Sequence, residues 1–490
     1  MKNQLRLLYI TLLGAIITSC TNNLELEPTS VISNASFWKT QDDATGGVYG
    51  MYANLRTQAS RNLFLWGEAR SETVGAGVQG LDGRDLFYLN QLDATNSGPD
   101  WQGMYTVIHH ANLIIKYVPT ISFTSEATKN NTLAQAYAMR AYVYFCMVRT
   151  WGELPLVTEP TENFDPASVQ RERSSVANVF SLIKSDIDKS LALFPNNTFP
   201  TGRNVWSKPA LNALKGDVYL WTAKKLAGGT ADFTTALEAL NQVKSSDVSL
   251  LSNYNDVFDY TTKGNKEIIF AINFKRNEVT DNDYANMYFS PAYVPKDINS
   301  DVADALGVAA GQNFWAPTAT FRSQFTDDDQ RKNGTFREIY TATSGVSKFY
   351  GAFAVKFNGM VELGTRYFLD DYVVYRYADI LLMIAEVKNA LGQDPSTEIM
   401  QVRTRAYGSK VSAHPFTNGS QAQNDEVILQ ERLLELGLEG KRWWDLVRFN
   451  KAFDKVASLK DRTGKDYLLL FPISANTLSL ENKIRQNPGY

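Results

Sequence analysis

One stretch of sequence, residues 425–449, constrains the fold of this chain more than any other. It reads DEVILQERLLELGLEGKRWWDLVRF, which has the apolar spacing of a long helical run with few breakers. Leu429 and Leu433 lie near one face of that run, and Trp443 and Trp444 continue the apolar surface. A helix of this kind must be covered by other elements, so the chain requires a large, mainly helical core.

The same stretch is also densely charged, which allows two interpretations. It carries Glu431, Glu435, Glu439, Arg442, Asp445 and Arg448. Such a cluster is typical of an active site, but also of a buried helix whose carboxylates and guanidiniums pair with one another. Structural ion pairs perturb charges as catalytic sites do, so the stretch alone favours the paired, structural interpretation.

Composition excludes several other classes of function. The 490 residues are 44% hydrophobic and carry a net charge of −3, so nothing indicates binding to nucleic acid. Two of the three histidines, His109 and His110, are adjacent and point about 100° apart on a helix, which argues against a histidine-based metal site. Cys146 lies in an apolar helical run and is expected to be a buried thiol. We expect no cofactor.

The first residues have the features of a bacterial lipoprotein leader. Residues 1–19 combine an early positive charge with an eleven-residue apolar run from Leu7 to Ile17, which is too short to span a bilayer permanently. The run ends Ile17-Thr18-Ser19-Cys20, which resembles a lipobox. We therefore expect cleavage before Cys20, acylation of Cys20 and a polar tether over residues 20–39. An ordinary secretory peptide is the alternative.

Most of the remaining chain, residues 40–490, has the periodicity of helices. Helices are expected at about 100–118, 125–150, 174–194, 207–226 and 232–244, and again at 377–391 and 397–406. Gly216 and Tyr219 have the spacing of a tetratricopeptide-type helical hairpin. The predicted fold is therefore mostly α: tetratricopeptide-like hairpins stacked into an α-α superhelix that supports a loop-rich lobe with a few short strands.

Two regions lack helical periodicity and are the places where binding chemistry is expected. Residues 56–99 are rich in Gly, Asp and Asn, and residues 246–365 form a long excursion with strand-like runs at 267–273 and 354–357. The acidic run at 327–329 lacks the spacing of an EF-hand, so an acidic helix start or turn is favoured over a calcium loop. We predict one body with an N-terminal half (40–245), the excursion (246–365) and a C-terminal half (366–490).

Several short motifs follow one another along the chain. They are the lipobox Cys20 with Leu24-Glu25-Leu26-Glu27-Pro28, the helix Trp101…Tyr105…Ile108…Asn112, Arg140-Ala141-Tyr142, Arg149-Thr150-Trp151-Gly152, Tyr375-Arg376-Tyr377-Ala378-Asp379, Glu439-Gly440-Lys441-Arg442-Trp443-Trp444-Asp445-Leu446, Phe471-Pro472-Ile473 and Gln486-Asn487-Pro488-Gly489-Tyr490. Each motif is weak alone, but the ordered set covers nearly the whole chain and resembles the SusD/RagB family of outer-membrane nutrient-binding lipoproteins.

This resemblance implies a function as well as a fold. Members of the family sit on the outer face of the outer membrane, anchored by lipid. They capture oligosaccharides, or in some branches peptides, for a SusC-type TonB-dependent β-barrel transporter, and they are not enzymes. A peptide-binding RagB-like subunit is the first alternative, and a lipid-anchored glycoside hydrolase using carboxylates such as Glu435, Glu439 and Asp445 is a weaker one.

The residues that would contact a glycan are not carried over from the family motifs. Sugar rings stack on aromatic faces, and their hydroxyls bond to charged or amide groups. On these grounds the loop-rich regions supply the candidates: Trp66, Asp82, Arg84 and Tyr88 in the first region, and Tyr288, Tyr293, Phe314 and Trp315 in the excursion. Core packing is the competing interpretation for each, and most strongly for Trp66, which lies in the apolar run Phe64-Leu65-Trp66.

Overall fold

The computed structural model describes residues 37–80, 82–162, 169–278, 281–343 and 346–490. The predicted signal peptide, the acylated Cys20 and most of the predicted tether lie outside the described residues. Within the described ranges, no helix is long and apolar enough to cross a membrane. The predicted division of the body into two halves and an excursion stays a prediction.

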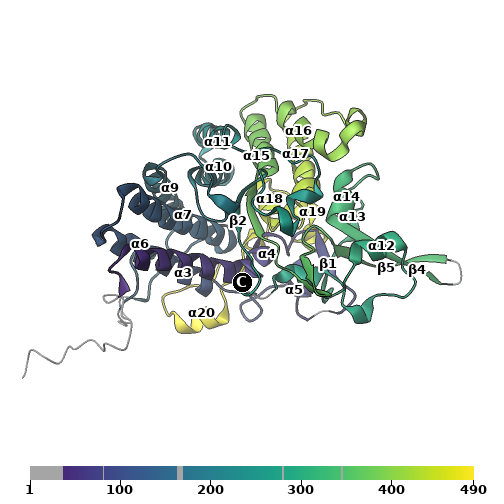
Figure 1. Ribbon diagram of the computed structural model, residues 1–490, viewed down its shortest axis with the longest axis horizontal. Coiled ribbons are helices and arrows are strands. Elements are labelled where there is room, and N and C mark those ends of the chain that lie inside the picture. Colours follow the sequence, from purple (N-terminus) through teal and green to yellow (C-terminus); the bar gives the residue numbers. More distant parts are fainter. Residues whose placement is uncertain (1–36, 81, 163–168, 279–280, 344–345) are drawn as a thin grey trace, which may run out of the picture.

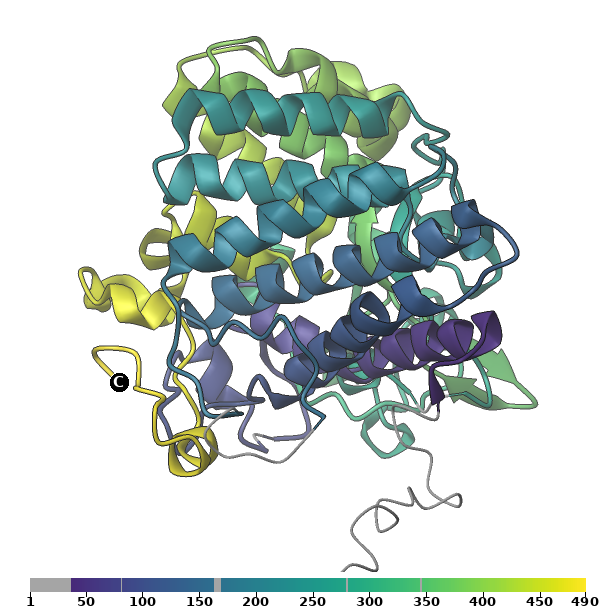
Figure 2. The same ribbon diagram turned by 90° about the vertical axis from the view of Figure 1, so that its left-hand side faces the viewer.

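The mostly helical fold predicted from the sequence is confirmed. Figure 2 shows long helices stacked in a row from α3 at the bottom to α15 and α16 at the top, each packed against its neighbours. The row consists of α3 (Gln41–Ala59), α6 (Gln102–Tyr117), α7 (Glu126–Trp151), α9 (Val176–Leu193), α10 (Lys208–Lys225), α11 (Gly229–Lys244), α15 (Tyr377–Ala390), α16 (Ser396–Tyr407) and α17 (Gln421–Leu436).

The helices begin where their capping residues place them. Thr40 and Asp43 form a reciprocal capping box at the start of α3, as their spacing predicts. Ser207 accepts a hydrogen bond from the backbone of Ala210 at the start of α10, and a proline follows within the first turn. These caps satisfy backbone N–H groups that have no partner inside the helix.

The predicted helical hairpin between α10 and α11 is present, and Gly216 accounts for its close packing. A Cβ atom at Gly216 would lie 2.4 Å from Cδ2 of Leu240, so any larger residue would force the Leu240 side chain or the helix to shift. α15 and α16 form the second predicted hairpin and pack against α11 and α17. The hairpins therefore stack on one another as in tetratricopeptide repeats.

A second lobe of short strands and loops lies on the right of Figure 1. In the described residues the strands form four antiparallel pairs: β1 with β3, β4 with β5 and β6 with β7 belong to this lobe, and β2 with β8 lies near the centre of Figure 1, where β2 packs against α3 and α10. They are β1 (Val74–Ala76), β2 (Ile268–Ile272), β3 (Trp315–Pro317), β4 (Phe336–Thr343), β5 (Val346–Ala354), β6 (Met360–Glu362), β7 (Thr365–Tyr367) and β8 (Tyr372–Arg376). The short helices in the described ranges are α4 (Asn62–Gly67), α5 (Asp85–Tyr88), α12 (Ser300–Leu306), α13 (Ala319–Arg322), α14 (Gln330–Thr335), α18 (Arg442–Arg448), α19 (Ala452–Lys455) and α20 (Ala475–Leu480).

Two local predictions in the excursion have different outcomes. The strand-like run at 267–273 is β2, but the run at 354–357 is not a strand, because β5 ends at Ala354. The chain turns at residues 356–357, where the buried ammonium of Lys356 donates to the backbone carbonyls of Glu435 and Gly437. The acidic run at 327–329 starts a helix as predicted: the Asp329 side chain accepts from the backbone of Arg331 at the beginning of α14.

The prediction of one continuous helix over residues 425–449 is wrong. The stretch forms α17 and α18, joined by a loop that contains Leu438 at φ 69° and Gly440 at φ 75°. Three backbone N–H groups, those of Leu438, Lys441 and Arg442, donate to the carboxylate of Glu68 at 2.8, 3.0 and 3.2 Å. This buried carboxylate replaces the helical hydrogen bonds that the loop lacks, which allows the chain to turn here.

Candidate functional site

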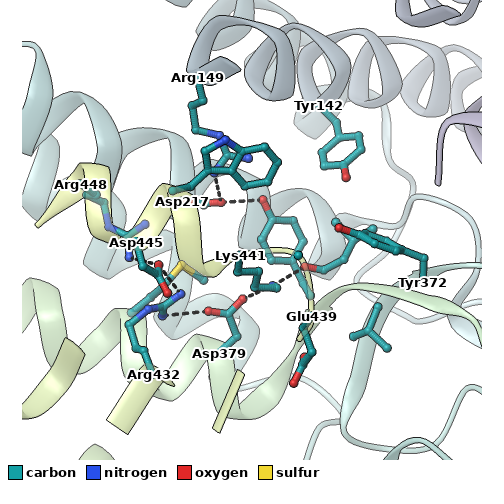
Figure 3. Close-up of a pocket in the computed structure, with 16 residues that line it drawn as sticks. Tyr142, Arg149, Asp217, Tyr372, Asp379, Arg432, Glu439, Lys441, Asp445 and Arg448 are labelled. Atoms are coloured by element: carbon teal, nitrogen blue, oxygen red, sulfur yellow. Dashed lines mark hydrogen bonds and ion pairs between the residues drawn. The ribbon is translucent and has the colours of Figure 1, made fainter. Parts of the chain in front are cut away.

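The charged residues of α17 and α18 form a buried network of ion pairs. Asp445 lies 2.9 Å from both Arg432 and Arg448, and Asp379 lies 2.9 Å from Arg432 and also pairs with Lys441. Figure 3 shows these groups pointing toward one another from several elements. The pairing that the sequence favours for Asp445 and Arg448 is therefore confirmed, and Arg442 likewise pairs with Glu72 at 2.6 Å.

Glu435 and Glu439, from the same region, also form ion pairs with buried basic side chains. Glu435 lies 2.6 Å from Arg376 and also pairs with Arg405, while Glu439 lies 2.7 Å from Arg376 and 2.9 Å from Lys356. Burial alone would raise the pKa of Glu435, but the guanidiniums of Arg405 and Arg376 outweigh burial and hold that pKa well below its usual range. The pKa of Glu439 is also lowered, against burial, by Arg376 and Lys356.

This network lacks the properties of a glycosidase site. The general acid of such an enzyme needs a carboxyl group with a raised pKa, whereas the pKa values of Glu435 and Glu439 are lowered. The cavity drawn in Figure 3 has a volume of about 30 Å³, enough for a water molecule but not for a sugar ring. The charges of α17 and α18 thus hold the helical row and the second lobe together.

The candidate ligand residues gather instead at the edge of the second lobe. Arg84, just before α5, lies over the rings of Phe314 and Trp315, with Cζ 4.8 and 5.4 Å from the ring centroids. Asp82 pairs with the same guanidinium, and the ring of Tyr88 meets Trp315 edge-on at 6.4 Å. Five residues that the sequence singled out in two distant regions are therefore brought together. We call this group, Asp82, Arg84, Tyr88, Phe314 and Trp315, the Arg84 cluster.

Backbone contacts hold the two loops of the cluster in register. β1 pairs with β3, and beyond the strands the backbone N–H groups of Gly77 and Gln79 donate to the carbonyls of Phe314 and Asn313 at 3.1 and 3.3 Å. Asn313 is fully buried with φ 48°, and its side-chain oxygen accepts from the backbone of Val78 at 2.8 Å. Asn313 therefore fixes the loop that carries Asp82 and Arg84 beside Phe314.

One member of this neighbourhood was not anticipated from the sequence. Asp283, at the start of a 3₁₀ turn, lies 3.6 Å from Arg84 and 4.0 Å from Arg61. Burial raises the pKa of Asp283 to about 6, although Arg84 acts in the opposite direction. The sequence around Asp283 is an ordinary polar run, so no local signal marks it; only the fold brings it to Arg84.

The structure separates the candidate rings into buried and exposed ones. Trp315, Trp66 and Tyr288 are fully buried, so none of these three offers an open face to a sugar in this structure. Trp66 packs against Trp151 and Tyr288 against Phe353, as core residues do. Tyr88 and Phe314 are half-buried, and Tyr293, which lies away from the Arg84 cluster, is exposed beside Tyr350. Glycan contact by any of the candidates stays a prediction.

Among the described residues, no group of three or more His, Cys, Asp and Glu side chains is placed to hold a metal ion. The Arg84 cluster is instead a set of rings, one guanidinium and paired carboxylates. Rings of this kind stack on apolar faces, and the charged groups hydrogen-bond to hydroxyls. Chemically, the cluster suits a neutral or polar ligand with a flat apolar face.

Comparisons with known proteins agree with the fold and cover the whole described body. The model of the SusD family matches residues 340–490, and a model described as "Starch-binding associating with outer membrane" matches residues 82–220. SusD-like protein P38 of Formosa agariphila is 28% identical, over 97% of this chain and 96% of its own length.

Solved structures similar to this chain agree with the sequence comparisons. B. fragilis NanU is 33% identical with a TM-score of 0.86, covering 95% of this chain and all of NanU. A SusD superfamily protein from Bacteroides vulgatus is also 33% identical, with a TM-score of 0.83 over 92% of this chain and all of its own. A laminarin-binding SusD-like protein shares the fold at a TM-score of 0.75, over 92% of this chain and all of its own. Identity and coverage at these levels show that the chain belongs to the SusD/RagB family.

Proposed function

We propose that this protein captures oligosaccharides at the cell surface and delivers them to a SusC-type TonB-dependent transporter of the outer membrane. The observation that carries the proposal is the Arg84 cluster, in which half-buried rings lie beside paired charges in a chain of this family. The family-model description of starch binding and outer-membrane association supports it. In this proposal Cys20 is acylated and tethers the body, and the protein performs no catalysis.

The binding step is tested on a glycan array with the purified mature protein. Wild type is expected to bind a defined set of glycans, and Tyr88→Ala and Phe314→Ala are each expected to weaken that binding about tenfold, because each removes a stacking surface. Tyr49→Ala is the matched control: Tyr49 is 68% exposed on α3, outside the Arg84 cluster. Unchanged affinity in both cluster variants would remove the cluster from the proposed function.

The class of ligand and the absence of catalysis are tested in the same samples. A reducing-sugar assay on bound glycans is expected to stay at background, whereas newly released sugar ends would establish a hydrolase. Binding of peptides and of no glycan would assign the protein to the peptide-importing branch. Transport is tested by co-purification: the acylated protein is expected to retain a β-barrel transporter in detergent, and recovery without one would contradict that part of the proposal.

A further inference from the structure

The hairpin formed by β4 and β5 presents aromatic side chains that the core does not use. In Figure 1 this hairpin projects from the right-hand edge of the molecule. The first five residues of β5 are exposed and the last four are buried, so only the base of the hairpin is part of the core. On the projecting part, Tyr340 is 39% exposed and Phe349 is 42% exposed.

Tyr340 and Phe349 lie on the same face of the hairpin. They are paired across the two strands, and their ring centroids are 5.7 Å apart at an interplanar angle of 75°. Directly paired residues of an antiparallel ladder point to the same side, so the rings form one angled surface. Tyr350 belongs to a different contact, since its ring stacks near Phe289 and its hydroxyl donates to the carbonyl of Tyr293.

A charged pair borders the two rings. Glu338 accepts a hydrogen bond from Nε of Arg322 at 2.6 Å and from the hydroxyl of Tyr340 at 3.2 Å. The guanidinium of Arg322 lies over Phe349, with Cζ 4.5 Å from the ring centroid, and Arg322 also donates to the carbonyl of Pro317. The result is a small constellation of two rings, one carboxylate and one guanidinium, held to β3 at one end.

We propose that these four residues, Arg322, Glu338, Tyr340 and Phe349, form a second contact for the captured glycan, which we call the hairpin platform. The inference rests on the proposed function and extends it from one site to two. Pro317 and Trp315 lie two residues apart on β3, so the platform and the Arg84 cluster share a strand about 7 Å long between these anchor points. A glycan that contacts both must therefore be longer than a single sugar unit.

The composition of the platform favours a sugar over a protein partner. A stable protein interface buries about 800 Å² on each side and is centred on well-buried anchors. Two half-exposed rings and a charge pair that is already neutralised offer far less area and no net charge to attract a partner. The same groups match one or two sugar rings, which combine apolar faces with hydroxyls.

The hairpin platform makes affinity depend on the length of the glycan, which gives the test. Titration calorimetry is run with a size series of the glycan identified on the array, using wild type, Tyr340→Ala, Phe349→Ala and the control Tyr49→Ala. We expect wild type to bind longer members of the series more tightly. Each platform variant should lose about threefold to tenfold in affinity for the long members and nothing for the shortest, while Tyr49→Ala stays unchanged.

Three outcomes would overturn the hairpin platform and leave the proposed function intact. In the first, both variants keep wild-type affinity across the series. In the second, affinity falls equally at every glycan length. In the third, glycan affinity is unchanged but the transporter no longer co-purifies, which would make the hairpin a protein-docking surface. Failure of the wild-type protein to bind any glycan would instead refute the proposed function. Both rings are exposed, so thermal melting of the variants should match wild type and separate lost binding from lost folding.

Discussion

At the scale of single residues, Asp445 shows what the buried charges contribute. Its carboxylate lies 2.9 Å from Arg432 and from Arg448, and all three side chains are buried. Asp445→Ala should lower the free energy of unfolding by about 3–5 kcal/mol, since it removes a shared carboxylate from two buried guanidiniums, which keep only their pairs with Asp379 and Glu386. Chemical denaturation measures this loss. Asp454→Ala, an exposed acid on α19, should change stability by about 0.5 kcal/mol or less.

The same variant separates structure from ligand binding. Glycan affinity of folded Asp445→Ala, measured below its melting temperature, should equal that of wild type, because the ion-pair network lies outside the Arg84 cluster. A large loss of affinity at unchanged stability would contradict the structural role of this network.

Asp370 predicts a pH dependence of stability. Burial raises the pKa of Asp370 to about 7, although a hydrogen bond from the backbone of Gly359 and the charge of Lys263 act in the opposite direction. The folded protein therefore holds this proton more tightly than the unfolded chain. The group's favourable contribution is complete below pH 4 and is lost as the pH rises through about 7.

Replacing the carboxyl group of Asp370 with an amide, which does not ionise, removes the loss of stability at rising pH. Asp370→Asn should be more stable than wild type at pH 8, by a few kcal/mol, and the difference should shrink as the pH falls toward 4. Melting temperatures of the two proteins at pH 4, 6 and 8 measure it. A constant difference at every pH would show that Asp370 does not titrate in this range.

At the scale of elements, the loop from β1 to α5 depends on one glycine. A Cβ atom at Gly77 would lie 1.8 Å from the carbonyl oxygen of Asn313, which is backbone and cannot rotate away. Gly77→Ala should displace the loop that carries Asp82 and Arg84 and weaken glycan binding about tenfold or more. Gly46→Ala in α3 is the control, because its new Cβ would make only an ordinary contact of 3.9 Å with Phe37.

Hydrogen exchange gives the structural readout of this prediction. Amides of residues 77–80 and 313–315 should exchange faster in Gly77→Ala, with the helical row unaffected. Normal binding combined with normal exchange would show that the loop tolerates the substitution.

The elements differ in how far sequence predicts them. Helices with a capping residue and regular apolar spacing, such as α3 and α10, are predictable because the signals are local. The break between α17 and α18 is not, since it depends on the carboxylate of Glu68, 370 residues away from Leu438. The prediction of a strand at 354–357 is wrong beyond Ala354: the chain turns there, and the ammonium of Lys356 binds a carbonyl of a segment 79 residues away, a contact that no local pattern encodes.

At the scale of the whole molecule, attachment to the membrane is predicted to depend on Cys20. Cys20→Ala should move the protein from the membrane fraction to the soluble fraction, because it removes the only residue predicted to carry acyl chains. Fractionation and immunoblotting measure this, with Cys146→Ala as the control, since that thiol is buried. Unchanged retention of Cys20→Ala would contradict lipid anchoring.

The candidate site shows the limit of sequence reasoning for the whole fold. Choosing rings from loop-rich regions found Tyr88 and Phe314, which are partly open, but also Trp315 and Trp66, which the core covers. Loop composition indicates where the backbone is irregular. Whether a side chain in such a loop is buried depends on which other segments of the fold pack against it. Asp283 reaches Arg84 only because segments about 200 residues apart in sequence meet at this lobe.

The long separation between Glu68 and its backbone partners also sets an order of events in folding. Hairpins such as α10–α11 close over short distances and can form early. The contacts of Glu68 require residues 438–442 to be in place. Before those backbone N–H groups are positioned, burying the Glu68 carboxylate would cost free energy, because it would lose water without gaining hydrogen bonds. The contact between Glu68 and the loop that joins α17 to α18 should therefore form late, in a slow phase that Glu68→Gln would alter while leaving the early helical phase unchanged.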